Sequence, residues 1–415
     1  MASILDTVWG TGPQRARRHS QGPGARPAPG GNPRRNARLT EIDRFGADPG
    51  ALRMLTYAPK DLAPGSPLVV VLHGCSQTAE GYDAHSGWSA LADELGFALL
   101  YPEQRRGNNL AGCFNWFHPA DTARGLGEAR SIREMIETLV AKRRLDRGRI
   151  FVTGLSAGGA MAAHLLAAYP EVFSAGAIIA GLPCGAAANV KEAFEVMAKP
   201  AALGDAELGD AVRAGAPYEG PWPRVSIWQG LADHTVSPKN ADLLVRQWVD
   251  VHGAETAPAV DDRDGRRRRR VWRFEGRDVV EAQTIEGLGH GTPLDGRRGE
   301  TPGPFMLDVG VSSTREIAAF FGMGTSGTIA SRTAVGDETT TAAAAAPSVG
   351  KAARTETSPR RKTTSAPDAA PSNDTTRRGR SAAPADTASP WDADAGGFDV
   401  SGVITKALKA AGLMR

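Results

Sequence analysis

The chain has 415 residues, 41% of them hydrophobic, which is enough to bury one large core or two ordinary ones. Its 49 basic and 46 acidic side chains leave a net charge of +3, and this balance argues against nucleic acid as the main partner. Cys75, Cys113 and Cys184 are too few for a disulfide framework and lack metal-ligand spacing, so we expect no structural metal.

The amino-terminal part of the chain, residues 1–36, is rich in Arg, Gly and Pro and has no hydrophobic periodicity. Such a composition predicts a disordered basic arm. It contains no apolar signal-peptide core, and no window of the chain approaches the roughly 18 apolar residues of a membrane span. The sequence therefore predicts a protein that does not span a membrane and is cytoplasmic, unless a start site was missed or another export route is used.

Short apolar runs alternate with helical patterns through the middle of the chain. Five runs are typical of parallel strands covered on both faces, at residues 67–74, 97–103, 149–154, 175–181 and 224–230. Apolar residues at helical spacing predict one helix from Leu126 to Leu139 and another from Ala241 to Trp248. This alternation predicts an α/β domain at residues 37–323, with a mostly parallel, doubly wound sheet and helices on both faces.

Five consecutive arginines at residues 266–270 precede the segment "VWRFEGRDVVEAQTIEG". The segment is typical of two strands that turn at Glu275 and Gly276. We interpret the arginines as a solvated edge or hairpin arm, with a nucleic-acid patch as the alternative.

The carboxyl-terminal part changes composition twice. Residues 324–396 form a Thr/Ala/Pro-rich tract with almost no large apolar side chain, which predicts a disordered linker. Residues 397–415 place Val403, Ile404 and Leu408 at helical spacing, which predicts a short amphipathic helix.

The segment "RIFVTGLSAGG" crowds small residues into the joint between a strand and a helix. Gly154, Ser156 and Gly158 fit G-x-S-x-G, a strained turn that exposes the serine hydroxyl above the sheet. The small residues are needed because the strand and helix backbones pass close together. We predict Ser156 as a nucleophile and the N–H of Ala157 as an oxyanion donor, the alternative being a glycine-rich turn with an incidental serine.

A nucleophilic serine needs a histidine base and an orienting carboxylate, which follow it in the order acid, then histidine. Three histidines lie downstream: His234, His252 and His290. His290 lies in a glycine-flanked loop after a strand-like run, whereas His252 ends a predicted helix and is expected to interact with its dipole. Asp233 is the first carboxylate after the strand at 224–230. We predict Asp233 as the acid and His290 as the base, the alternative being loop residues that cap turns.

A second oxyanion donor is expected in the loop after the strand at 67–74. The segment "HGCSQTA" offers the backbone N–H of Cys75, or of its neighbour Ser76. Cys75 then acts through its main chain. Its thiol is not expected to be the nucleophile, because Ser156 is the better candidate for activation by the histidine.

Several separated blocks of the sequence resemble the esterase/poly(3-hydroxybutyrate) depolymerase family, with the short-chain-length polyhydroxyalkanoate depolymerase catalytic domain most similar. The blocks are "PLVVVLHGCSQTAEGYD", "LLYPEQ", "GCFNWF", "RIFVTGLSAGGAMAAHLLAAYPEVFSAGAIIAGLPCG", "WQGLADHTV", "GLGHGTPL" and "GPFMLDVGVSSTREIAAFFG". The resemblance implies an α/β-hydrolase fold, the triad named above and Cys75 as an oxyanion residue. It also implies that Asn115 and Trp116 line the acyl or polymer cleft, although a buried core tryptophan is the alternative.

The residues and the resemblance together predict a serine esterase that hydrolyses poly(3-hydroxybutyrate) or its oligomers through an acyl-enzyme, with no cofactor. A feruloyl, acetyl-xylan or general short-acyl carboxylesterase is the alternative, because these enzymes share the triad. A non-catalytic granule or scaffold protein is a third hypothesis, and the candidate triad argues against it.

The sequence departs from the family in its termini and leaves its compartment open. Most members are extracellular and carry a signal peptide, and many have a polymer-binding domain after a linker. Here about 20 residues follow the linker, too few for such a domain. The terminal helix therefore docks on a partner or lipid-coated granule, or has no role. Cys75 and Cys113 can form a bridge in an oxidising compartment and remain thiols in a reducing cytoplasm.

Overall fold

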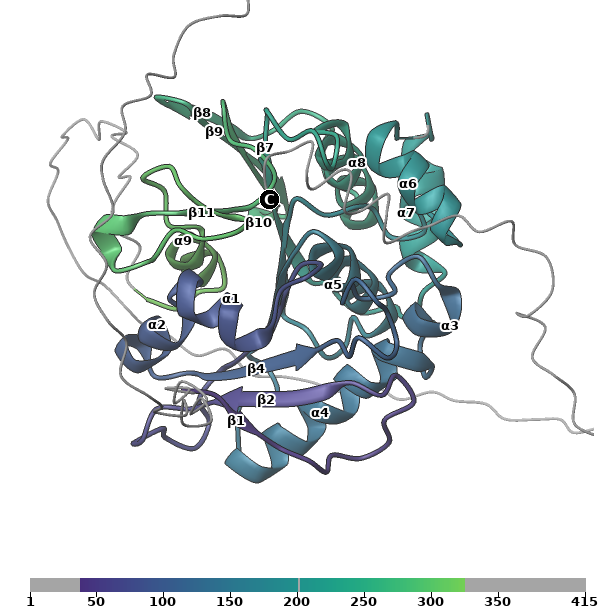
Figure 1. Cartoon of the computed structure of the whole chain (residues 1–415). Helices are drawn as coiled ribbons and strands as arrows, with labels where there is room; N and C mark the ends of the chain where they lie inside the picture. The colour runs from purple at the N-terminus through teal and green to yellow at the C-terminus, as the bar shows by residue number, and fades with distance from the viewer. Residues whose placement is uncertain (1–37, 201, 325–415) are drawn as a thin grey trace, which may run out of the picture. The chain divides into compact units, whose positions relative to one another are not determined.

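A ten-stranded sheet organises residues 38–200 and 202–324, the part of the chain that the computed structural model describes (Figure 1). The strand order is β1-β2-β4-β3-β5-β6-β7-β10-β9-β8. Its elements belong to one compact unit that ends at Phe321. The predicted basic arm, linker and terminal helix lie outside the described residues, and the proposed domain boundaries stay predictions.

The central strands of the sheet run parallel. They are β4 (Ala98–Glu103), β3 (Leu68–Leu72), β5 (Ile150–Leu155), β6 (Ala175–Ile179), β7 (Arg224–Gly230) and β10 (Arg277–Ile285). Every residue of β3, β5 and β6 is buried, as expected for strands covered on both faces. The five predicted parallel strands are confirmed.

Antiparallel strands extend the sheet at both ends, and most of them were not predicted. β1 (Thr40–Glu41) and β2 (Arg53–Tyr57) lie beyond β4. At the other end β9 (Arg267–Phe274) pairs with β10, and the edge strand β8 (Val260–Asp264) pairs with β9. The predicted turn is confirmed, because Glu275 and Gly276 connect β9 to β10 with φ of 49° and 74°.

Four of the five consecutive arginines, Arg267 to Arg270, lie in β9 of the hairpin arm, as interpreted from the sequence, and Arg266 precedes the strand. The four side chains in β9 form ion pairs within the protein: Arg267 with Glu316, Arg268 with Asp261, Arg269 with Glu281 and Arg270 with Asp242. These carboxylates already neutralise the positive charge that a nucleic-acid patch would need to present.

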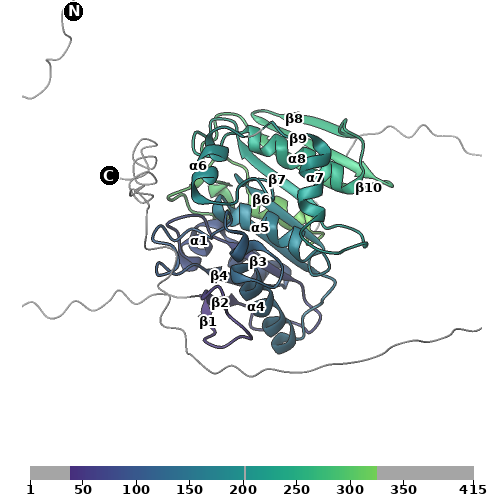
Figure 2. The same ribbon diagram turned by 90° about the vertical axis from the view of Figure 1, so that its right-hand side faces the viewer.

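Helices cover both faces of the sheet. Figure 1 shows α1 (Ala79–Ser86), α2 (Trp88–Leu95) and α9 (Ser313–Phe320) on one face. The other face carries α4 (Gly127–Arg143), α5 (Ala157–Ala168) and α8 (Lys239–His252), the side that Figure 2 turns toward the viewer. The two predicted helices are α4 and α8. Leu126 is the residue before α4 rather than part of its buried face, and its side chain is 51% exposed.

Shorter elements complete the described chain. They are α3 (Pro119–Thr122), α6 (Val190–Ala198), α7 (Asp205–Arg213), β11 (Thr292–Leu294), the 3-10 helix η1 (Gly296–Arg298) and β12 (Met306–Asp308). Among the described helices, none combines the length and the apolar character needed to cross a bilayer.

The parallel pairing decides where the predicted site residues meet. Ser156 directly follows β5, Asp233 follows β7, and His290 follows β10. Because parallel strands end at the same edge of a sheet, the three loops lie side by side there.

Candidate active site

Ser156, His290 and Asp233 form a continuous hydrogen-bonded chain. Nε2 of His290 lies 2.9 Å from Oγ of Ser156, and Nδ1 of His290 lies 2.7 Å from Oδ2 of Asp233. All three residues are buried, with exposed fractions of 8% for Ser156, 9% for His290 and 3% for Asp233. The structure therefore brings together the three residues predicted as nucleophile, base and acid.

The Asp233 carboxylate is held from both sides. Its Oδ1 accepts hydrogen bonds of 2.8 Å from the N–H groups of Thr235 and Val236, in a tight turn after β7. Its Oδ2 accepts one of 3.0 Å from Nε2 of Gln229, the penultimate residue of β7. Donors to both oxygens fix the carboxylate plane and leave Oδ2 directed at His290.

The loop with His290 is pressed onto the loop with Asp233. A Cβ atom on Gly230 would collide with the carbonyl oxygens of Leu288 and Gly289, so only glycine lets the two backbones approach this closely. The N–H of Ala232 also donates to the Leu288 carbonyl at 2.9 Å. The spacing between the acid and the histidine is thus set by main-chain contacts.

Ser156 has the backbone of a nucleophile elbow. Its φ of 58° and ψ of −118° are strained for a residue with a side chain, and its N–H donates to the Ile179 carbonyl at 2.8 Å. A Cβ on Gly154 would collide with the Gly158 carbonyl, and one on Gly158 with the carbonyls of Leu72 and His73. The glycines are therefore required for the close approach of β5, β3 and α5 that the motif predicted.

The N–H groups of Cys75 and Ala157, predicted as oxyanion donors, are not engaged by the described part of the protein. Within the described residues neither Cys75 nor Ala157 donates its N–H to a protein acceptor. The alternative donor, Ser76, gives its N–H to the Ala111 carbonyl at 2.8 Å, and Gly74 gives its own to Oε1 of Gln77 at 2.8 Å. Of the N–H groups considered in this loop, that of Cys75 is the free one.

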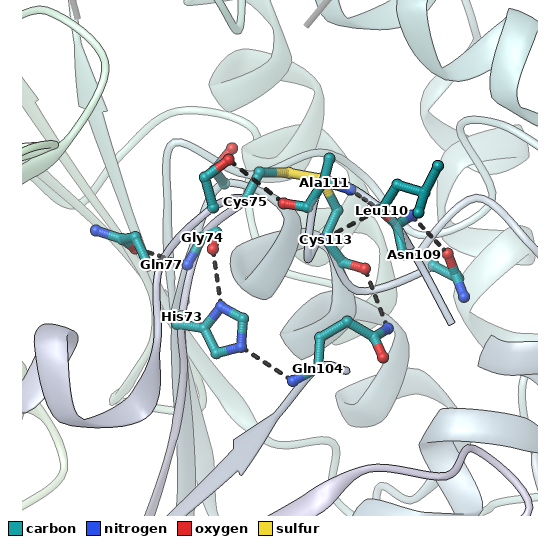
Figure 3. The surroundings of a disulfide bond; sticks show 12 residues. His73, Gly74, Cys75, Gln77, Gln104, Asn109, Leu110, Ala111 and Cys113 are labelled. Carbon is teal, nitrogen blue, oxygen red and sulfur yellow. Dashed lines mark hydrogen bonds between the residues drawn. A yellow bond between two sulfur atoms is a disulfide. The ribbon is translucent and has the colours of Figure 1, made fainter. Parts of the chain in front are cut away.

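A disulfide joins Cys75 to Cys113 across 38 residues, which answers the question that the sequence left open (Figure 3). It connects the loop after β3 to the loop that carries Asn115 and Trp116. Cys184 is the free cysteine of the described residues, and burial raises the pKa of its thiol to about 12.

Buried polar side chains form hydrogen bonds to the two loops that the disulfide joins. Nε2 of Gln104 donates to the Cys113 carbonyl at 3.1 Å and to the Glu128 carboxyl, whose Oε2 accepts the N–H of Asn115 at 2.9 Å. The N–H of Gln104 donates to Nε2 of His73 at 3.1 Å, and Nδ1 of His73 then donates to the Gly74 carbonyl (Figure 3). One network therefore positions the disulfide and the chain on either side of it. The supporting role of Glu128, Gln104 and His73 was not predicted: His73 and Gln104 lie in quoted sequence blocks, but no local motif indicates that they bond to one another.

The Glu128 carboxyl is 1% exposed. Burial, and then the charge of Asp121, raise its pKa to about 8. It is therefore largely protonated at neutral pH, which removes the cost of burying a charge beneath the two loops.

Asn115 and Trp116 lie next to the disulfide, but their side chains are engaged within the protein. Oδ1 of Asn115 accepts a hydrogen bond of 2.9 Å from Asn109, and Trp116 is only 4% exposed and packs edge-on against Phe117. The burial of Trp116 fits the core alternative. A role of either residue in lining the cleft stays a prediction.

Phe305 lies beside the histidine of the triad and was not predicted. Its ring meets the His290 ring edge-on, with centroids 6.0 Å apart. Its φ of 62° is strained, and its carbonyl accepts the N–H of Thr292 at 2.7 Å. This half-buried ring therefore forms an apolar surface beside the His290 imidazole.

The other downstream histidines are excluded from the site by their positions. His234 is exposed. His252 is the last residue of α8, as predicted, but burial lowers its pKa to about 4, so its imidazole is neutral at pH 7. The expectation that a charged His252 interacts with the helix dipole is therefore wrong. Nε2 of His252 lies instead 3.1 Å from the Pro223 carbonyl oxygen.

Comparison with known proteins shows the family of the chain. A family model described as esterase PHB depolymerase matches residues 54–272. The chain belongs to this family. Poly(3-hydroxyalkanoate) depolymerase C of Paucimonas lemoignei is 43% identical over 291 residues, which are 69% of this chain and 70% of that relative. Feruloyl esterase B of Neurospora crassa is 33% identical over 266 residues, 62% of this chain and 90% of the relative.

A solved structure agrees with the family. The acetyl xylan esterase from Aspergillus awamori superposes with a TM-score of 0.58 and 26% identity, over 63% of this chain and 97% of that one. This member of the esterase PHB depolymerase family is thus a carboxylic ester hydrolase with the α/β-hydrolase fold, and the resemblance stated from the sequence is confirmed.

Proposed function

We propose that the enzyme hydrolyses short-chain polyhydroxyalkanoate, poly(3-hydroxybutyrate) or its oligomers, with Ser156 as nucleophile, His290 as base and Asp233 as orienting acid. The observation that carries the catalytic assignment is the continuous hydrogen bonding from Ser156 through His290 to Asp233. The substrate assignment is supported by the 43% identity to a poly(3-hydroxyalkanoate) depolymerase over 291 residues.

In the first half of the reaction Oγ of Ser156 attacks the ester carbonyl while Nε2 of His290 takes its proton. Asp233, fixed by its own donors, accepts from Nδ1 and so stabilises the imidazolium that forms when Nε2 takes the proton. The protonated Nε2 then gives its proton to the leaving alkoxide, and the acyl group remains on Ser156. Water repeats the attack with His290 again as base, which releases the acid and restores the serine.

The backbone N–H groups of Cys75 and Ala157 are proposed to hold the negative oxygen of each tetrahedral intermediate. Both belong to rigid segments, one tied by the disulfide and the other at the first residue of α5. Donors that are already oriented need no reorganisation when charge develops, which is why such sites typically contribute about 3 kcal/mol per donor.

A feruloyl or acetylxylan esterase activity is the second candidate, supported by the 33% identity to feruloyl esterase B and by the fold of an acetyl xylan esterase. All three activities use the same triad chemistry, so the walls of the cleft decide among them. The higher identity favours the polyester.

We infer that the enzyme works in an oxidising compartment, outside the cytoplasm that the sequence alone suggested. The Cys75–Cys113 disulfide supports this, because such bonds are rarely kept in a reducing cytoplasm. Docking of the terminal helix on a granule or partner remains a proposal on residues outside the described part.

The test measures release of 3-hydroxybutyrate from short oligomers and from amorphous polymer, beside turnover of methyl ferulate and p-nitrophenyl butyrate. Wild type and Ser156→Ala are compared. We expect wild type to prefer hydroxybutyrate esters and the variant to be inactive on every ester. Turnover of methyl ferulate alone would overturn the substrate, whereas activity in Ser156→Ala equal to wild type would overturn the nucleophile.

A further inference from the structure

A cavity opens where the parallel strands begin, at the edge of the sheet opposite the triad. It has a volume of about 750 Å³ and is lined by Gly148, Ser174, Tyr218, Trp222, Arg224 and Arg277, among others; we name it the strand-start pocket. Ser174 immediately precedes β6, while Arg224 and Arg277 are the first residues of β7 and β10. The triad follows the far ends of β5, β7 and β10, so the two sites lie on opposite edges of the sheet.

The guanidinium of Arg224 is the most informative group in this pocket. It is partly buried against the ring of Phe320, with Cζ 4.7 Å from the ring centroid. Within the described residues it has neither a hydrogen bond nor an ion pair through its side chain. Burial lowers the pKa of Arg224 and the charge of Arg277 adds to that effect, against the opposing charges of Asp278 and Glu281. A partly buried cation without a hydrogen-bonded or ionic partner would be stabilised by a bound anion.

The carboxylates around Arg224 are already bonded to other arginines. Glu171 pairs with Arg124, Asp278 with Arg273 and Glu281 with Arg269. Arg277 at the pocket wall forms no ion pair among the described residues. The strand-start pocket therefore presents two guanidinium groups whose donors are free for a ligand.

An aromatic wall complements the charge. The rings of Tyr218 and Trp222, both half-buried, meet edge-on with centroids 5.3 Å apart. The Tyr218 hydroxyl donates to the Pro221 carbonyl at 3.0 Å, which fixes the ring. A rigid apolar wall beside two guanidinium groups suits an anion with an apolar body, and the volume falls within the range of small-molecule sites.

We propose that the strand-start pocket binds the carboxylate end of a short hydroxyalkanoate oligomer, so that the enzyme holds its own product class at a second, non-catalytic site. The ester repeat lies on Tyr218 and Trp222, and Arg224 and Arg277 hold the carboxylate. Every ester hydrolysed at the triad creates one such carboxylate end. The identity of the ligand rests on the proposed function, whereas the preference for an organic carboxylate rests on the pocket alone.

The experiment uses the full chain carrying Ser156→Ala, which cannot turn the ligand over. The trimer of 3-hydroxybutyrate and its methyl ester are titrated by calorimetry into this protein and into versions that also carry Arg224→Gln or Arg130→Gln. Arg130 is an exposed arginine of α4 outside the pocket and serves as the matched control. We expect the free acid to show a binding event that the methyl ester lacks. Arg224→Gln should weaken this event about tenfold or more and Arg130→Gln should not change it.

Equal binding of acid and ester, or no effect of Arg224→Gln, would overturn the proposal. Inorganic phosphate bound as tightly as the trimer would overturn the carboxylate preference. If Arg224→Gln does not fold, Arg277→Gln, at an exposed side chain, gives the same test with a weaker expected effect. Wild type that hydrolyses no hydroxybutyrate ester would overturn the proposed function. If butyrate or ferulate then binds in an Arg224-dependent way, carboxylate binding in the strand-start pocket is still supported.

Discussion

His290 and Asp233 face one another across 2.7 Å although 57 residues separate them in the chain. The carboxylate accepts from Nδ1 and so leaves the lone pair of Nε2 directed at Ser156. Because Oδ1 of Asp233 already accepts two backbone N–H groups, the reactive tautomer depends on Oδ2 alone.

Asp233→Asn should therefore lower kcat on p-nitrophenyl butyrate by about 10⁴. The amide oxygen will take the place of Oδ1 on its two donors, so the NH2 group will face His290 and force the proton onto Nε2. Thermal unfolding should show a folded protein. A decrease in kcat below tenfold would mean that another group orients the histidine.

Gly158→Ala should destabilise the protein by about 2 kcal/mol or more and reduce activity. The added methyl group would collide with the carbonyl oxygens of Leu72 and His73, and neither backbone can move without displacing β3. Gly107→Ala is the matched control, because a Cβ there meets nothing within 4 Å. Urea unfolding of both variants checks the difference, and similar midpoints would contradict it.

Removing the Cys75–Cys113 disulfide should cost about 4 kcal/mol of unfolding free energy, the entropy of an open loop of 38 residues. It should also lower kcat, because the loop that holds the Cys75 N–H loses its link to Cys113. The measurement compares wild type with and without reductant. The double variant Cys75→Ser, Cys113→Ser should match reduced wild type and should not respond to reductant. An unchanged kcat after reduction would show that the polar network alone holds the loop.

The buried Glu128 predicts a pH dependence of stability. Its pKa is raised to about 8 in the folded protein, so between pH 4.5 and 8 the unfolded chain loses this proton while the folded chain keeps it. This contribution is fully present below pH 4.5 and is lost as pH rises toward 8, by about 1.4 kcal/mol per pH unit.

Glu128→Gln should remove that slope. The variant loses part of the hydrogen bonding to Gln104 and Asn115 at pH 5, but its unfolding free energy should fall less than that of wild type between pH 5 and 8. Denaturant titrations at several pH values measure this difference. Asp121, whose pKa is also raised by burial, is the neighbouring titrating group; because its charge helps to raise the Glu128 pKa, Asp121→Asn should narrow the pH range of the slope without removing it. Parallel pH profiles for wild type and Glu128→Gln would contradict the prediction.

The parts of the fold that the sequence could predict are those with a strong local signal. β3, β5 and β6 are continuous apolar runs, and the elbow of Ser156 requires glycines at fixed positions. β4 and β7 show the same apolar signal, whereas β1, β2 and β8, which the sequence did not predict, lack it. The sequence of β8 is "VDDRD", a polar segment. It forms a strand because its backbone pairs with that of β9 and its acidic side chains face arginines of β9.

The same distinction holds at the site. Asp233 and His290 could be predicted because the order of an α/β-hydrolase chain limits the choice. Glu128 and Gln104 could not, because their importance lies in contacts with Asn115 and Cys113 that arise only after folding. Phe305 likewise reaches His290 only through the pairing of Thr292 with its backbone.

The two outer strands of the sheet bear on whether enzyme molecules can pair through their sheets. β1 has only two residues, and four of the five residues of β8 are charged. A short edge offers too few backbone groups to recruit a strand from another molecule, and a charged edge repels or solvates one that approaches. Both outer strands therefore disfavour pairing with a strand of another molecule. The ten-stranded sheet is thus protected from β-linked aggregation at each edge.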